Sequence, residues 1–196
     1  MEISKTNCVI WLTGLSGAGK SSIANELKRA ILALGKPACI LDGDIVRRGL
    51  CSDLTFTPQD RKENIRRISE VAKLFSEAGI ICIVALISPL RNDRLAARSI
   101  FKSGQFIEVY VNAPIEICEQ RDPKGLYAKA RAGEIKKFTG VSAPYEPPEK
   151  PEIELPTDQL TIATSVNRIL DYLADIPSSN HDAGHSYAAK IARWFS

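Results

Sequence analysis

The chain alternates short apolar runs with stretches in which apolar residues recur every three or four positions. The apolar runs predict strands at residues 8–12, 38–41, 80–86 and 106–111. The periodic stretches predict helices at residues 21–34, 58–78, 93–102, 114–120 and 165–174. Strands that alternate with helices form parallel sheets with helices on both faces, so we expect a three-layer α/β fold.

The second predicted helix begins with a capping signal. Thr57 precedes Pro58, and Asp60 follows three residues after the threonine. A threonine can cap the free N–H groups of a first turn, and proline fits the first helical position. Gly79 ends the helical pattern. The apolar residues that we expect to face the core are Ile65, Ile68, Val71, Ala72 and Phe75.

Residues 14–21, called the glycine loop below, match the pattern G-x-x-x-x-G-K-[ST] between the first predicted strand and helix. Glycines let such a loop wrap around phosphate oxygens, and a helix N-terminus favours the anion. Lys20 can reach the β- and γ-phosphates, and the Ser21 hydroxyl can bind Mg²⁺. The residues expected to hold the nucleotide are Gly14, Ser16, Gly17, Ala18, Gly19, Lys20, Ser21 and Ser22. A turn needed only for packing is the alternative, but the complete pattern predicts a nucleoside triphosphate site.

Two carboxylates follow the second predicted strand. Asp42 and Asp44 stand where the carboxyl ends of parallel strands gather the groups of an active site. Asp44 could accept the proton of an acceptor hydroxyl, and Asp42 could orient Mg²⁺ through water. The alternative is that both residues only cap the next turn.

Further polar residues predict an acceptor site for a small anion. Arg47 follows Asp44 by three residues, and Arg61 and Asn64 share one face of the long helix. Guanidinium groups grip oxyanions in a planar fork, although an ion-pair lattice with nearby acids is the alternative. Ser88 adds a hydroxyl after the third strand.

Residues 122–150 form a long, basic segment punctuated by glycines. Such a segment inside a compact domain is usually functional, and we expect a mobile lid over the site. A solvated surface loop is the alternative.

Length and composition fit one globular domain, and we expect the protein to be cytoplasmic. The chain has 196 residues, 44% hydrophobic residues and a formal net charge of +3, which gives no reason to expect nucleic acid. No apolar run is long enough to span a membrane. The five cysteines are an odd number with no C-x-x-C spacing. Four lie in or beside apolar segments, where we expect buried thiols, and Cys51 is the exception, because it lies in a polar loop near the expected site. We expect a kinase domain over residues 1–176 and a tail, frayed or a small docking helix, over residues 177–196.

Several longer segments resemble the adenylylsulfate kinases, a family of P-loop kinases. The glycine loop is shared by a vast superfamily, but RDPKGLY-KARAGEI-FTG is specific to this family. The matching segments are GLSGAGKSSIA, LDGDIVRRGL, RKENIRRISEVAKLF, ISPLRNDR, CEQRDPKGLYAKARAGEIKKFTG and PYEPP. The resemblance implies a P-loop NTPase fold and transfer of the γ-phosphoryl of ATP, with Mg²⁺, to the 3′-hydroxyl of adenosine 5′-phosphosulfate. The family commonly dimerises, so we expect a homodimer.

The resemblance also implies a role for each matched residue. Asp44 matches an aspartate near the acceptor hydroxyl, and Phe56 and Phe138 match an aromatic pair that sandwiches the acceptor adenine. Ser88 matches a serine that some members were thought to phosphorylate; we expect it to line the pocket, because in-line transfer needs no covalent intermediate. The candidate catalytic residues are Lys20, Asp44 and Ser88. The candidate acceptor residues are Asp42, Asp44, Arg47, Phe56, Arg61, Asn64, Ser88, Lys136 and Phe138.

The loop after the second strand departs from the family pattern at four positions. Ile45, Arg48, Cys51 and Thr55 replace the usual Asn, His, Asn and Gly. These changes remove no group assigned to the chemistry, but they alter the loop that holds Arg47. Two alternatives therefore stay open: a P-loop kinase for another small anionic acceptor, and a nucleotide-binding regulatory subunit with little turnover.

Overall fold

A five-stranded parallel sheet forms the middle layer of the protein. The computed structural model describes residues 7–175. The sheet has the strand order β2-β3-β1-β4-β5, and every neighbouring pair is parallel. The strands are β1 (Val9–Thr13), β2 (Ala38–Asp42), β3 (Ile81–Ala85), β4 (Phe106–Asn112) and β5 (Ile153–Pro156). The predicted α/β fold with a parallel sheet is confirmed.

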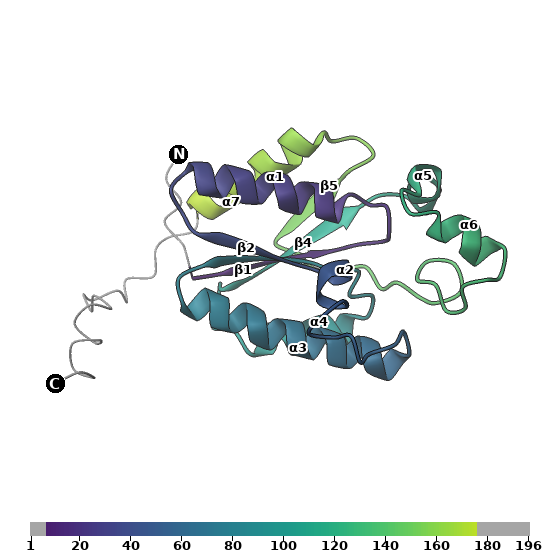
Figure 1. The fold of residues 1–196 in the computed structure, drawn as a ribbon. Coiled ribbons are helices and arrows are strands. Elements are labelled where there is room, and N and C mark those ends of the chain that lie inside the picture. The colour runs from purple at the N-terminus through teal and green to yellow at the C-terminus, as the bar shows by residue number, and fades with distance from the viewer. Residues whose placement is uncertain (1–6, 176–196) are drawn as a thin grey trace.

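Helices cover both faces of this sheet (Figure 1). The helices α1 (Lys20–Ala33) and α7 (Ile162–Asp175) lie on one face, and α3 (Pro58–Glu77) and α4 (Arg91–Ser99) lie on the other. The short helices α5 (Ile115–Arg121) and α6 (Leu126–Arg131) lie beyond the carboxyl end of the sheet, at the right of Figure 1. The three layers expected from the sequence are therefore present.

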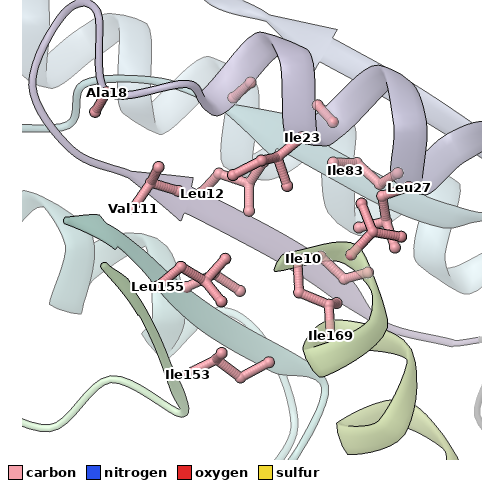
Figure 2. Packing of buried hydrophobic residues seen from close by; sticks show 14 of the residues in the cluster. Ile10, Leu12, Ala18, Ile23, Leu27, Ile83, Val111, Ile153, Leu155 and Ile169 are labelled. Carbon is pink, nitrogen blue, oxygen red and sulfur yellow. The ribbon is translucent and has the colours of Figure 1, made fainter. Parts of the chain in front are cut away.

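The central strand β1 joins the two hydrophobic clusters of the core. It is buried along its whole length, and successive side chains point to opposite faces. Ile10 and Leu12 belong to the cluster under α1 and α7, together with Ile23 (Figure 2). Trp11 belongs to the cluster under α3 and α4, together with Ile68. This alternation explains why the strand sequence is apolar without interruption.

The long helix α3 begins and ends as its sequence predicts. The Thr57 hydroxyl accepts a hydrogen bond of 3.1 Å from the backbone N–H of Asp60. After the helix, Gly79 has a φ of +79°, in the left-handed region that favours glycine. Of the five apolar residues expected to face the core, Ile65, Ile68 and Ala72 are buried and the other two are half-buried.

Three short elements are absent from the sequence-based prediction. β5 has four residues and exposes Glu154, α2 (Gly43–Val46) is a single turn, and α6 has six residues. Segments of this length show too few repeats for a hydrophobic period to appear. α7 also begins three residues before the predicted position 165. The predicted tail at residues 177–196 lies outside the described residues.

The expectation for Cys51 needs a correction. Its neighbours in the sequence are polar, yet the side chain is fully buried, and its N–H donates to the carbonyl of Val46 at 2.9 Å. Burial raises the pKa of the Cys51 thiol above its ordinary value. This cysteine is therefore a packing residue of the loop. Cys39 is half-buried, and the other three cysteines are buried.

Across residues 7–175, no helix is both long and apolar enough to cross a membrane.

Replacing Thr57 by alanine should lower the free energy of unfolding by about 1 kcal/mol, because the first turn of α3 loses its cap. Urea unfolding of the variant beside the parent protein measures this. Gln59→Ala, an exposed change in the same turn, should alter stability by less than about 0.5 kcal/mol. Equal effects of the two substitutions would contradict the assigned cap.

Candidate active site

A cleft of about 1020 Å³ opens at the carboxyl ends of β1, β2 and β3. Every residue predicted for the nucleotide, acceptor and metal sites lines it, with the exception of Gly14. Gly14 lies behind the cleft, with a φ of +151°, and a Cβ there would come 2.3 Å from the carbonyl oxygen of Val111. The absence of a side chain is therefore required for β1 to turn into the glycine loop beside β4.

Lys20 is held by the loop that it follows. Its Nζ donates to the carbonyl oxygens of Gly14 at 2.9 Å and Leu15 at 2.6 Å. Burial lowers its pKa to about 8, while the carboxylates of Asp42 and Asp44 act in the opposite direction. Lys20 thus lies under the glycine loop, and a bound anion would stabilise its charged form.

The Asp42 carboxylate connects Ser21 to the backbone of Asp44. The Ser21 hydroxyl donates to Asp42 Oδ2 at 2.7 Å, and the Asp44 N–H donates to Asp42 Oδ1 at 2.9 Å. Asp42 therefore does cap the turn of α2, as the alternative interpretation held, and it meets the predicted metal residue as well. The Ser21 hydroxyl and the Asp42 carboxylate supply hard oxygen ligands of the kind that Mg²⁺ prefers.

Asp44 has a partner that the sequence did not predict. Its carboxylate forms an ion pair with Lys124, from the start of the basic segment 122–150. Both side chains are more than half exposed, so the pair contributes little to stability. It places a positive charge of the basic segment directly over the candidate catalytic carboxylate.

The two predicted acceptor arginines bind backbone oxygens. Arg47 donates to the carbonyls of Leu54 and Thr55 at 3.2 and 3.0 Å, and its guanidinium lies 4.3 Å from the centre of the Phe56 ring. Arg61 donates to Phe56 O at 3.1 Å. Within residues 7–175 neither arginine forms an ion pair, so the predicted alternative of a surface ion-pair lattice is wrong for these two residues.

Arg61 also joins α3 to the basic segment. It donates to Lys137 O at 3.2 Å and to the Thr139 hydroxyl at 3.3 Å. Burial lowers the pKa of Arg61, and the nearby charge of Arg47 acts in the same direction. The two guanidinium groups lie 4.3 and 5.5 Å from the centre of the same Phe56 ring. Two like charges so close together, with no carboxylate partner among residues 7–175, favour the binding of an anion.

Asn64 carries an unused acceptor. The residue is 5% exposed, and its Oδ1 has no hydrogen-bond partner among the described residues. Buried polar atoms are nearly always satisfied, so such an atom on the lining of a cleft indicates a ligand or a water molecule.

Ser88 is fixed from behind by residues of the core. It has a φ of +39°, which is unusual for a serine, and its hydroxyl accepts a hydrogen bond of 3.1 Å from Trp11 Nε1. The buried guanidinium of Arg94 donates to Ser88 O at 2.6 Å and to Glu108 Oε1 at 2.7 Å. The same guanidinium donates to Glu146 O at 2.7 Å, so it joins the cleft wall to the end of the basic segment.

The two aromatic residues both reach the cleft but differ in burial. Phe56 is 60% exposed, whereas Phe138 is 8% exposed and meets the Tyr127 ring edge to face. Lys136 lines the cleft beside Phe138. Part of the basic segment thus lines the cleft, although its lysine side chains are exposed.

Sequence reasoning missed several residues that complete the site. Lys124 contacts Asp44, and Thr139 contacts Arg61. At the other end of the cleft, Arg121 donates to Thr157 O at 2.6 Å, and the Thr157 hydroxyl donates to Ala18 O at 2.8 Å. Lys124 and Thr139 lie in the family-specific motif and could have been found there. Thr157 has no sequence signal, because it follows the short strand β5.

The parallel sheet, the glycine loop and the long cleft together define a P-loop kinase. A family model described as adenylylsulphate kinase matches residues 6–156. This match covers more than half of the protein, and the chain therefore belongs to the adenylylsulphate kinase family.

Individual relatives agree with this assignment. The adenylyl-sulfate kinases of Shewanella pealeana and Marinobacter nauticus are each 56% identical to the chain over 168 residues, 86% of this chain. The match covers 82% and 84% of those two proteins. The Mycobacterium tuberculosis APS kinase CysC, solved in complex with AMPPNP and APS, is 44% identical, with a TM-score of 0.83. That comparison covers 86% of this chain and 98% of the mycobacterial chain.

Replacing Arg94 by methionine should lower the free energy of unfolding by about 3 kcal/mol, because Glu108 keeps only the longer contact of 3.4 Å to Arg98. Urea unfolding measures the change. The double variant Arg94→Met/Glu108→Met removes both charges and should regain a large part of the loss. A double variant no more stable than the single one would show that the buried charge is not the cause.

Proposed function

We propose that this protein transfers the γ-phosphoryl group of ATP to the 3′-hydroxyl of adenosine 5′-phosphosulfate (APS). The observation that carries the proposal is one continuous cleft. The glycine loop lies at one end, and at the other lie two arginines that have no carboxylate partner within residues 7–175. Asp44 lies near enough to Lys20 and to Arg47 to act on the pKa of both. This position between the two ends suits a group that handles the acceptor hydroxyl.

The glycine loop and the groups behind it would hold the triphosphate. Its N–H groups meet the phosphates at the start of α1, and Lys20 moves from loop carbonyls to the β- and γ-phosphate oxygens. Arg121 and Thr157 lie at the far end of the loop, where the base of ATP would extend. The AMPPNP complex of the mycobacterial relative supports ATP as the donor.

Ser21 and Asp42 fit a magnesium ion that arrives with the nucleotide. Within residues 7–175 no group of three or more His, Cys, Asp or Glu side chains could hold a metal by itself. One hydroxyl and one carboxylate next to a phosphate loop are the usual protein share of a Mg²⁺ site, with phosphates and water supplying the rest. When bound, the ion neutralises charge on the transferred phosphoryl group.

The acceptor end supplies charge, stacking and a base. Arg47 and Arg61 would bind the phosphosulfate, Asn64 Oδ1 would accept a hydrogen bond from the acceptor, and the acceptor adenine would stack between Phe56 and Phe138. Asp44 would orient the 3′-hydroxyl and accept its proton as the phosphoryl group transfers. Ser88 shapes the wall and is not phosphorylated.

The basic segment 122–150 would act as a lid. Phosphate oxygens compete with Asp44 for Lys124, so nucleotide binding would draw Lys124 to the phosphates and release the carboxylate for the acceptor. Closure excludes water, which would otherwise take the phosphoryl group. We also expect a homodimer and a cytoplasmic location, which light scattering and cell fractionation test.

Lys20→Ala and Asp44→Asn should each lower kcat by about 10²-fold or more, because each removes a group that acts on the transferring phosphoryl or the attacking hydroxyl. A coupled assay with ATP, Mg²⁺ and APS measures this, with circular dichroism to show an intact fold. Asp171→Asn, an exposed change on α7, is the matched control and should keep parental kcat. Near-normal turnover in either active-site variant would refute its assigned role, and an inactive parent protein would refute the reaction.

The affinity for AMPPNP should fall as the pH rises above 8. Lys20 has a pKa of about 8 without ligand, and bound phosphates raise it. Above pH 8, binding must therefore take up a proton, and the affinity falls by up to about tenfold per pH unit. Below pH 8 the amine is already charged and adds no slope.

Calorimetric titrations between pH 7 and 9.5 measure this dependence. Lys20→Met, which cannot take up the proton, is the control and should show no such slope. The same slope in parent and variant would assign the proton to another group.

A further inference from the structure

Tyr127 touches structures at both ends of the cleft without lining it. The residue is 2% exposed, and its hydroxyl donates to the carbonyl oxygen of Ser16 at 3.0 Å. Its ring meets Phe138 edge to face, with ring centres 5.0 Å apart and an interplanar angle of 79°. Burial raises the pKa of Tyr127, so the phenol keeps its proton as a donor. The Tyr127 side chain therefore contacts both the glycine loop and Phe138, the residue expected to stack on the acceptor adenine.

The short helix α6 fixes the position of Tyr127. Gly125, which directly precedes α6, has a left-handed conformation. The Asp122 carboxylate accepts hydrogen bonds from the N–H groups of Leu126 at 2.8 Å and Ala128 at 3.1 Å. These bonds satisfy free N–H groups in the first turn of α6, a helix that is too short to be stable alone. Tyr127 is consequently held in place by hydrogen bonds to the residues immediately before and after it in the chain.

The hydrogen bond from Tyr127 fixes the orientation of the peptide group between Ser16 and Gly17 in the glycine loop. A trans peptide is planar, so its C=O and its N–H point in opposite directions. When the Ser16 carbonyl points to Tyr127, the N–H of Gly17 must point away from Tyr127. Gly17 lines the cleft, and its Cα has no room for a side chain, because a Cβ there would come 2.8 Å from Cys118 O.

Phe138 sits on a turn that rests against the same loop. The Phe138 N–H donates to the Ser142 hydroxyl at 2.9 Å, and Phe138 O accepts from the Ala143 N–H at 3.0 Å. A Cβ on Gly140 would come 2.9 Å from the Leu15 side chain of the glycine loop. The turn and the loop are thus in contact, and Tyr127 adds a ring contact to one and a hydrogen bond to the other.

We propose that Tyr127 is a positioning residue for both substrates. Its hydroxyl sets the peptide between Ser16 and Gly17 for the phosphates of ATP, and its ring supports Phe138 against the acceptor base. This inference rests on the proposed function. It makes the two contacts separable: the hydroxyl acts on the nucleotide, and the ring acts on the acceptor.

Two substitutions separate these contacts. Tyr127→Phe removes the hydroxyl and keeps the ring, so AMPPNP should bind roughly 2- to 10-fold more weakly while APS affinity changes less than about twofold. Tyr127→Leu removes both, so APS affinity should fall as well, by roughly 3- to 10-fold. Calorimetry with each ligand measures the affinities, and steady-state assays should show the same split in KM.

Tyr145→Phe is the matched control. It also deletes a hydroxyl of segment 122–150, here bonded to Thr13 at 3.0 Å, and its ring stacks on Tyr110 outside the cleft lining. We expect a lower Tm for this variant but ligand affinities within about twofold of the parent values.

The result decides between positioning and general support of the fold. A Tyr127→Phe protein with parental AMPPNP affinity, or with AMPPNP and APS weakened equally, would overturn the inference, and so would an equal effect of Tyr145→Phe. Should the leucine variant not fold, Tyr127→Met, which is closer to tyrosine in volume, tests the ring in its place, and the phenylalanine variant still tests the hydroxyl. A parent protein that binds AMPPNP but does not phosphorylate APS would instead refute the proposed function, and the nucleotide arm would still test the hydroxyl.

Discussion

The close approach of backbone segments around the glycine loop constrains the rest of the structure. Gly14 lies against the carbonyl of Val111 in β4, and Gly17 lies against the carbonyl of Cys118 in α5. Neither position has room for a Cβ, so the path from β1 into α1 is set by neighbouring main chain. Because α5 and segment 122–150 pack on this path, the walls of the cleft take their positions from the loop.

The site keeps its positive charges available through its choice of partners. Lys20, Arg47 and Arg61 donate to carbonyl and hydroxyl oxygens, which satisfy N–H groups without cancelling charge. Arg94, behind the wall, pairs with a buried carboxylate and is neutralised. An arginine whose partner oxygens are neutral keeps its charge for binding an anion, whereas an arginine paired with a carboxylate stabilises the fold.

Much of this organisation could be predicted from the sequence, where a local pattern determines the outcome. The glycine loop, the Thr57 cap and the apolar strands depend on neighbours in the chain, and the structure has them. Contacts between distant segments could not be predicted in the same way. The burial of Cys51, the pairing of Asp44 with Lys124 and the strand β5 each depend on which segment folds over which, and composition does not record that.

The loop of residues 45–55 is fastened at points that do not depend on most of its side chains. Arg67 holds the Asp53 carboxylate at 2.6 and 2.8 Å and Leu50 O at 3.0 Å, while the Asp60 carboxylate accepts bonds from the N–H and hydroxyl of Thr55. Arg47 binds two carbonyls at the end of the loop. An exposed residue such as Ile45 can therefore be replaced while the contacts of Arg67, Asp60 and Arg47 keep the loop in place. The sequence at the edge of the acceptor site can thus vary in evolution without a change in the backbone that supports it.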